Sequence, residues 1–130
     1  METNTGKLNK ETIFVDLDGT LILFNLEPER VTDRIIPSTM SYLIKKKAEG
    51  ACIVCTTARS AWHTALAIAN ANIPLDFFDH ILYDLPMGKR ILINDTKDIN
   101  TPSAEAMVLE RDKGMSKPVA YMQSIIMGRA

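Results

Sequence analysis

The sequence predicts a single-domain α/β fold built on a mostly parallel sheet. Short apolar runs rich in β-forming residues alternate along the chain with segments of helical spacing. The length of 130 residues suits one domain. We expect residues 1–10 to form a polar, loosely ordered lead-in and residues 11–130 to form the domain.

The first predicted strand covers residues 12–17. It is apolar on both faces, which is typical of a central strand in a covered parallel sheet. The chain must turn directly afterwards, at Asp18-Gly19. Residues 20–36 alternate between apolar and charged positions and contain Pro28, so we interpret them as an irregular flap and not as a long helix.

Two helices and a second strand follow. The first helix is predicted to begin at Ser38, its expected cap, and to end at Gly50, where a left-handed conformation is common. The second strand covers residues 51–56. Ser60 is expected to cap the second helix, which runs to residue 69.

The C-terminal half is less regular. Two further strands are predicted at residues 80–83 and 90–93, and the linker 85–89 between them is too short for a crossover helix. We therefore expect an antiparallel edge hairpin or an extended crossing there. Residues 102–113 fit a helix by propensity and a fifth strand by their apolar run, and both remain open. A last helix with an apolar stripe is predicted to begin at Pro118.

Composition excludes several classes of function. The net charge is −1 and the pI is near 6.1, which argues against a strongly basic nucleic-acid binder and a polybasic membrane surface. No run of about 18 apolar residues is present, so no membrane span is expected. The N-terminus lacks the layout of a signal peptide, and we expect a cytoplasmic protein.

The two cysteines, Cys52 and Cys55, lie three positions apart on a predicted strand. Residues at this spacing face opposite sides of a strand, so their thiols do not converge on one metal ion. We expect buried, inert thiols and no redox or zinc role.

Polar residues gather where the predicted strands end. Open α/β sheets bind ligands beyond the carboxyl ends of their strands. The residues at these ends supply acids, hydroxyls and bases from three strands. They are Asp16, Asp18, Thr57, Arg59, Asp95, Lys97 and Asp98.

Asp16 and Asp18 are spaced by two, so on an extended strand both carboxylates point the same way. Two like charges on one face repel each other unless a cation or a shared proton relieves them. Mg²⁺ typically takes one or two carboxylates together with phosphate oxygens, and Asp95 offers a further carboxylate. Gly19 allows a tight reversal and a close approach of the backbone to a phosphate. The pattern therefore predicts a magnesium-assisted phosphate site.

These residues resemble the motifs of the haloacid dehalogenase-like (HAD-like) phosphatase superfamily. Residues 14–20 match its first motif, Asp-x-Asp-Gly-Thr after an apolar strand, and residues 53–59 match the second, a Ser or Thr ending the next strand. Residues 91–95 match the fourth, an acidic cluster after a later strand. The resemblance covers residues 12–115 and implies a Rossmann-like three-layer sandwich.

The resemblance also implies a two-step mechanism through an aspartyl-phosphate. Asp16 attacks phosphorus, and Asp18 protonates the leaving oxygen and then activates water. The implied Mg²⁺ ligands are Asp16, Asp18 through its backbone carbonyl, and Asp95. The implied phosphate-binding residues are Gly19, Thr20, Thr57, Ala58, Arg59 and Lys97.

The family's third motif is a lysine, for which this chain offers two candidates. Lys89 precedes Asp95 by six positions, so on a strand it would lie about 20 Å from the site. Lys97 follows Asp95 in the expected loop, and we prefer it. We expect Asp98 either to support the metal ligands without binding the ion directly or to have a structural role.

Neither spacing between the motifs leaves room for a cap domain, so the chain resembles a capless member. A site without a cap must either be covered by a neighbouring subunit or accept a large substrate. We expect a homo-oligomer. A small sugar phosphate is the expected substrate. Two alternatives remain: a catalytically silent HAD-like binding subunit, and a receiver-type phospho-accepting switch domain.

Overall fold

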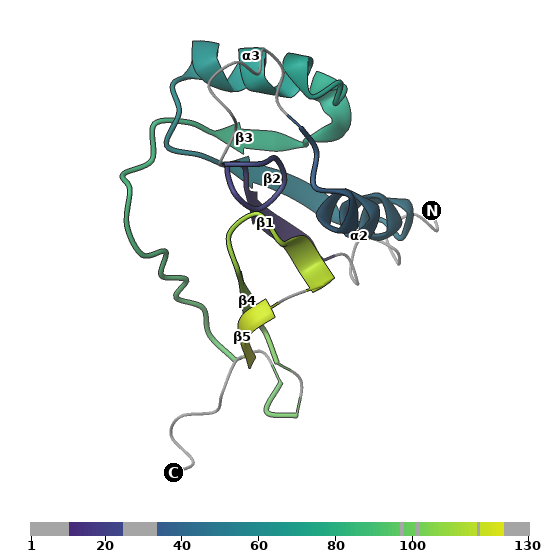
Figure 1. Ribbon diagram of the computed structural model, residues 1–130. Helices are drawn as coiled ribbons and strands as arrows, with labels where there is room; N and C mark the ends of the chain where they lie inside the picture. Colours follow the sequence, from purple (N-terminus) through teal and green to yellow (C-terminus); the bar gives the residue numbers. More distant parts are fainter. Residues whose placement is uncertain (1–10, 25–33, 97, 101, 117, 124–130) are drawn as a thin grey trace.

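The computed structural model describes residues 11–24, 34–96, 98–100, 102–116 and 118–123 (Figure 1). The expected lead-in, residues 1–10, lies outside these ranges, as do residues 25–33 of the expected flap. The strands and helices, in chain order, are β1 (Thr12–Asp16), α2 (Pro37–Ala48), β2 (Cys52–Thr56), α3 (Ala61–Asn70), η1 (Leu75–Phe77), β3 (His80–Leu82), β4 (Glu105–Leu109), η2 (Gly114–Ser116) and β5 (Pro118–Gln123).

The N-terminal half confirms the predicted α/β alternation. Strands β1, β2 and β3 form a parallel sheet in that order, and a helix lies between each consecutive pair. The register pairs Asp16 with Thr56, so β1 and β2 end at the same edge of the sheet. The acids at the end of β1 and the threonines at the end of β2 therefore lie at one shared edge.

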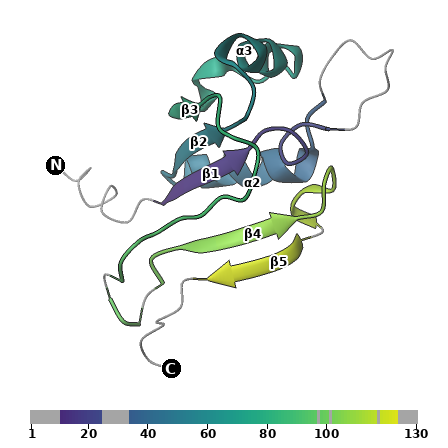
Figure 2. The same cartoon turned by 90° about the vertical axis from the view of Figure 1, so that its left-hand side faces the viewer.

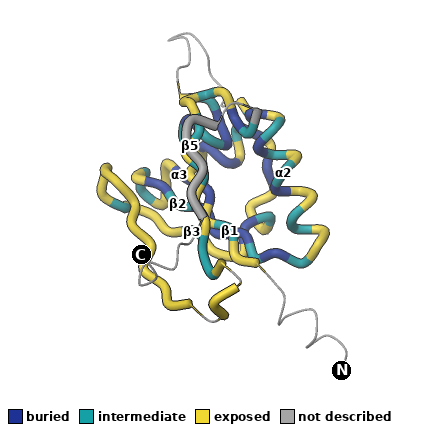
Figure 3. The backbone as a smooth tube through the Cα atoms, turned by 90° about the horizontal axis from the view of Figure 1, so that it is seen from below, coloured by how far each residue is buried: buried dark blue, intermediate teal, exposed yellow. Residues whose placement is uncertain are grey.

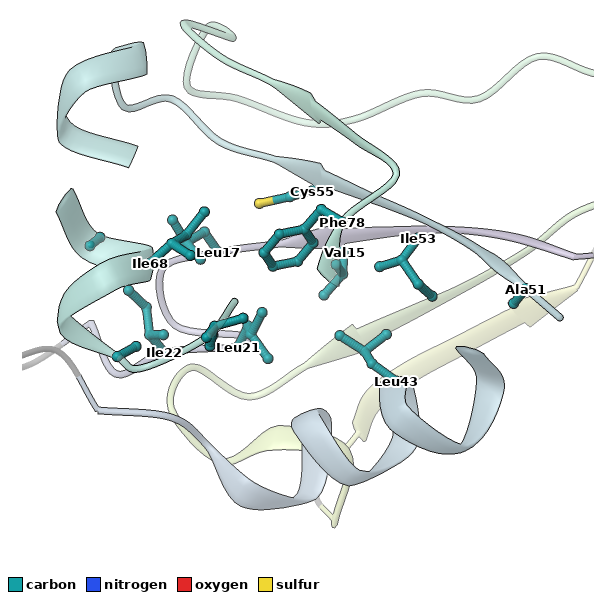
Figure 4. Close-up of a cluster of buried hydrophobic side chains, with 13 residues drawn as sticks. Val15, Leu17, Leu21, Ile22, Leu43, Ala51, Ile53, Cys55, Ile68 and Phe78 are labelled. Carbon is teal, nitrogen blue, oxygen red and sulfur yellow. The ribbon is translucent and has the colours of Figure 1, made fainter. Parts of the chain in front are cut away.

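One hydrophobic cluster joins the sheet to both helices. Val15 and Ile53 from neighbouring strands, Leu43 from α2 and Ile68 from α3 all belong to it (Figure 4). The burial of these side chains stabilises the sheet edge by removing apolar area from water. Phe14 points to the opposite face of β1 and is 55% exposed, so the face of β1 that was expected to be covered is open here. The third layer of the expected sandwich is therefore not seen in the described residues.

Helix capping follows the sequence prediction at one helix and departs from it at the other. The Ser60 hydroxyl accepts the backbone N–H of His63, which caps α3 as expected. Helix α2 has Ile36 as its N-cap residue, with no side-chain cap, and Pro37 starts it. The prediction of Ser38 as cap is wrong, because its hydroxyl accepts the backbone N–H of Met115 instead.

The C-terminal half corrects two predictions and decides a third element that the sequence left open. Residues 90–93 form no strand but run exposed between β3 and β4, as the yellow tube in Figure 3 shows. Residues 102–113, left open between helix and strand, contain β4 followed by a turn. The helix predicted from Pro118 is strand β5, which pairs antiparallel with β4.

The antiparallel hairpin therefore lies between β4 and β5 and not between the third and fourth predicted strands. The two arrows form a separate sheet in Figure 2. Cross-strand pairing satisfied backbone groups that a helix would have satisfied internally, and this pairing overrode the helical spacing of the sequence. No helix in the described ranges is both long and apolar enough to cross a membrane.

Candidate functional site

The turn after β1 places Asp16 and Asp18 at the carboxyl edge of the sheet. Asp16 is the last residue of β1 and is exposed. Leu17 is fully buried, and its carbonyl oxygen accepts the backbone N–H groups of Leu21 and Ile22 at 2.9 and 3.0 Å. This tight turn reverses the chain at the end of β1 and holds Asp16 and Asp18 on either side of the buried Leu17.

Gly19 is buried within this turn and has a φ of +83°, a conformation that side chains rarely adopt. Its predicted role in a sharp reversal is confirmed. Its backbone N–H donates to the carbonyl oxygen of Ile22 at 2.7 Å, and that of Thr20 is directed to the carbonyl oxygen of Leu17 at 3.4 Å. These two N–H groups are therefore used within the turn in this structure.

The surroundings of Asp16 act on the pKa of its carboxyl group in opposing ways, with a net rise. The surrounding protein desolvates the carboxylate, which raises its pKa above the ordinary value of 3.8, and the charge of Asp18 adds to the effect. A bond from the Leu17 backbone, the positive charge of Arg90 and a bond from the Thr20 side chain oppose the rise. Asp16 is thus an exposed carboxyl group whose pKa is raised by its surroundings.

Asp18 forms a two-point ion pair with Arg59. The Arg59 Nε donates to Asp18 Oδ2 at 2.9 Å, and Nη2 donates to Oδ1 at 2.7 Å. The side chain of Arg59 is 31% exposed and that of Asp18 is 26% exposed, so the pair is partly shielded from solvent. Such fork-shaped pairing is stronger and more directional than a single bond to a lysine would be.

The loop after β2 presents Arg59 to this pair. Thr57 is 1% exposed, and its hydroxyl oxygen accepts the backbone N–H of Arg59 at 3.1 Å. The Arg59 carbonyl oxygen accepts the backbone N–H of Asp84 at 2.9 Å. Ala58 lies exposed between the two predicted residues. The structure thus brings Asp16, Asp18, Thr57 and Arg59 to one edge.

Asp95, the third carboxylate of the predicted metal site, is not grouped with them in this structure. In the described part of the chain, no three His, Cys, Asp or Glu residues gather closely enough to hold a metal ion. Asp95 lies in a loop where its backbone N–H is bonded to Asn94 Oδ1 and its carbonyl oxygen accepts the Ser103 hydroxyl. The physical reason is that residues 90–93 form no strand beside β1, so nothing carries Asp95 to the sheet edge.

Asp98 has a local bond that fits the predicted structural role. Its Oδ1 accepts the backbone N–H of Asn100 at 3.0 Å, which is a side-chain turn of the kind that aspartates commonly form. The preferred lysine, Lys97, lies outside the described residues.

Arg90 is a cation that the sequence analysis missed. Its charge lowers the pKa of Asp16, and its Nη1 donates to the carbonyl oxygens of Pro86 and Gly88 at 2.8 and 3.1 Å. Lys89 lies exposed beside it. The sequence signal is the pair Lys89-Arg90, in which Arg90 begins a predicted strand and is therefore not expected near the site.

Comparison with protein-family models, curated proteins and solved structures finds no match. The chemistry of the site residues is therefore the basis for a function.

Cys55 lies directly behind the acids. It is fully buried and free, and burial together with the charges of Asp16 and Asp18 raises the pKa of its thiol to about 12. The thiol stays protonated at neutral pH, as expected for an inert residue. Cys52 is also free and is partly buried.

Proposed function

We propose that this chain is a magnesium-dependent phosphomonoester hydrolase of the HAD-like superfamily, without a cap domain, that forms an aspartyl-phosphate on Asp16. The observation that carries the proposal is the juxtaposition of an exposed Asp16 with the Asp18–Arg59 pair at the carboxyl edge of a parallel sheet. A small sugar phosphate is the proposed substrate class.

In the first step, an Asp16 carboxylate oxygen attacks phosphorus in line, and the bond from phosphorus to the leaving oxygen breaks. Asp18 gives its proton to that oxygen, so the alcohol leaves neutral. In the second step Asp18 takes a proton from water, and the resulting attack on phosphorus releases phosphate and restores Asp16.

Arg59 has to change partner during this sequence. It occupies both oxygens of Asp18 in the structure, whereas the mechanism needs Asp18 to carry and release a proton. A phosphoryl group offers the same bidentate acceptor geometry as a carboxylate. Arg59 therefore passes from Asp18 to the phosphoryl oxygens when substrate binds, and Thr57 fixes the backbone on which it turns.

The oxygen donors at this edge fit a magnesium ion in part. Asp16 and the backbone carbonyl of Asp18 are the proposed ligands from the first turn, and substrate phosphate and water complete the usual set. When bound, Mg²⁺ would supply positive charge to offset the negative charge of the transferring phosphoryl group. Asp95 is the proposed third protein ligand, although it stands apart in this structure.

Replacing Asp95 with asparagine is expected to raise the Mg²⁺ concentration for half-maximal activity by about 10-fold or more, because a neutral amide is a poorer ligand than a carboxylate. The measurement is a magnesium titration of p-nitrophenyl phosphate hydrolysis. Asp98→Asn is the matched control and should shift the midpoint little, because its amide oxygen can still accept the Asn100 N–H. Equal midpoints for Asp95→Asn and the wild type would remove Asp95 from the metal site.

Arg90→Ala is expected to lower kcat by about 10-fold, because a positive charge acting on Asp16 also stabilises the charge of the transferring phosphoryl group. Lys89→Ala, one position away, should remain within about twofold of the wild type. Lys97→Ala tests the lysine preferred from the sequence. Comparing the kcat values of the three variants shows how much each cation contributes to the reaction. A fully active Arg90→Ala enzyme would exclude Arg90 from the site.

Turnover of p-nitrophenyl phosphate with Mg²⁺ tests the proposed function as a whole. Sustained turnover that is lost in Asp16→Asn supports it. A phospho-accepting switch or a silent binding subunit would give no sustained turnover, and that result would overturn the proposal.

A further inference from the structure

The loop that follows the acids is held at both ends by a residue 88 or more positions away. The backbone N–H of Asp112 donates to the carbonyl oxygen of Gly19 at 2.8 Å. The same residue's Oδ1 accepts the backbone N–H of Phe24 at 2.6 Å. One aspartate thus bridges the start and the end of residues 19–24, and the turn after β4 lies beside this loop in Figures 1 and 2.

The preceding residue packs against the same two positions. The Arg111 guanidinium lies 4.1 Å from the centre of the Phe24 ring. Its Cγ lies 3.1 Å from the point that a Cβ on Gly19 would occupy, which is a tight contact, and the positive φ of Gly19 is what favours glycine there. Arg111 and Asp112 together cover the loop that carries Asp18 into the site.

Asp112 adopts a backbone conformation that costs energy. Its φ is +68°, which is uncommon for a residue with a side chain, although aspartate tolerates it better than most. Such a conformation persists where the surroundings determine it, and it is often found at functional sites. Here it is the conformation in which the Asp112 backbone and side chain bond the loop simultaneously.

The turn that carries Asp112 is itself fixed to α2. The backbone N–H of Met115 donates to Ser38 Oγ at 3.0 Å. Gly114 is buried with a φ of +70°, and a Cβ there would clash with Ser38 Oγ and approach Ile36 Cγ2 to 2.7 Å. The turn therefore connects the acid loop to the first turn of a helix that packs on the core.

We propose that Asp112 is a positioning residue for the acid loop, acting through its backbone bond to Gly19 and its carboxylate bond to Phe24. It sets the path of the chain after Asp18 and with it the orientation of the proposed acid–base group. The expected effect of Asp112 on catalysis rests on the proposed function. The bridge itself is independent of that function and is tested separately.

Three substitutions at this position separate its two contributions. Asp112→Asn keeps a side-chain acceptor and tolerates the positive φ. Asp112→Gly keeps the backbone conformation and the N–H but removes the acceptor. Asp112→Ala removes the acceptor and strains the backbone. Glu110→Gln, an exposed acid in the same turn, controls for the loss of one negative charge.

The first measurement is hydrogen exchange of the Phe24 amide by NMR or by mass spectrometry of overlapping peptides. We expect it to exchange at least about tenfold faster in Asp112→Gly than in the wild type and in Asp112→Asn, while amides of β2 are unchanged. Unchanged exchange in Asp112→Gly would overturn the bridge, whether or not the protein is a phosphatase.

The second measurement is the kcat and KM for p-nitrophenyl phosphate, taken well below each variant's Tm. Asp112→Gly and Asp112→Ala should lose about tenfold or more in kcat with a smaller change in KM, because a misplaced acid–base group slows the chemical step. Asp112→Asn and Glu110→Gln should stay within about threefold of the wild type. A kcat unchanged in Asp112→Gly, or lowered equally in Asp112→Asn and Asp112→Gly, would overturn the positioning role even if turnover itself supports the proposed function.

Discussion

Replacing Asp16 with asparagine is expected to reduce phosphate-ester hydrolysis by about 10⁴-fold or more, the scale seen when a covalent nucleophile is removed. The amide cannot attack phosphorus, and the neighbouring Asp18 serves as acid and base in the proposed mechanism and does not replace it. The measurement is turnover of p-nitrophenyl phosphate together with mass spectrometry after a brief reaction with substrate. A phosphorylated species of wild type that is absent from Asp16→Asn supports the assignment.

The same variant is expected to be more stable than the wild type at neutral pH. The pKa of Asp16 is raised in the folded state, so its charged form costs stability at pH values above the folded pKa. Below the unfolded value of 3.8 the group is protonated in both states and the cost is absent. The Tm gain of Asp16→Asn should therefore be present at pH 7 and shrink as the pH falls towards 3.8.

Asp76→Asn, which removes an exposed acid in η1, is the matched control for both measurements and should leave turnover and Tm nearly unchanged. Substantial hydrolysis by Asp16→Asn would rule out an aspartyl-phosphate on this residue. A Tm gain that did not depend on pH would show that the gain does not come from the Asp16 charge.

Replacing Asp18 with asparagine is expected to lower kcat by about 10² to 10⁴-fold, the usual contribution of a general acid or base. The size of the loss should depend on the leaving group. p-Nitrophenolate leaves without a proton, so the first step is spared and phosphoenzyme accumulates because water is no longer activated. A sugar phosphate has a poor leaving group, so both steps are slowed.

The test compares p-nitrophenyl phosphate with a sugar phosphate by rapid-mixing kinetics. A burst of one p-nitrophenolate per enzyme, followed by slow turnover, is the expected signature of Asp18→Asn. The amide that this substitution introduces still offers one oxygen to Arg59, so the loop geometry should survive. Equal losses for both substrates, with no burst, would argue that Asp18 does not act as the acid and base.

The N-terminal half of the fold was predictable because its signals are local. The apolar run before Asp16, the cap at Ser60 and the stop at Gly50 each depend on a few neighbouring residues. The prediction that the second strand ends at residue 56, directly before Thr57, was also confirmed, and its last residue pairs with Asp16 at the same edge of the sheet.

The C-terminal half was not predictable in this way. Residues 90–93 have the composition of a strand, but a strand exists only where a partner pairs with it, and none does in the described residues. The segment 118–123 has helical spacing, but its pairing with β4 decided its conformation. Ser38 has a side chain suited to a helix cap, but its hydroxyl oxygen accepts the backbone N–H of Met115, which is 77 positions away.

The sequence by itself determined which chemical groups stand at the first edge of the sheet, because Asp16, Asp18 and Thr57 follow from short-range spacing along two strands. The tertiary structure alone decided how those groups are paired. The Arg59–Asp18 fork, the charge of Arg90 on Asp16 and the Asp112 bridge join residues 41 or more positions apart. Such contacts depend on distances of a few ångströms between atoms, and only the packing of the folded chain fixes those distances.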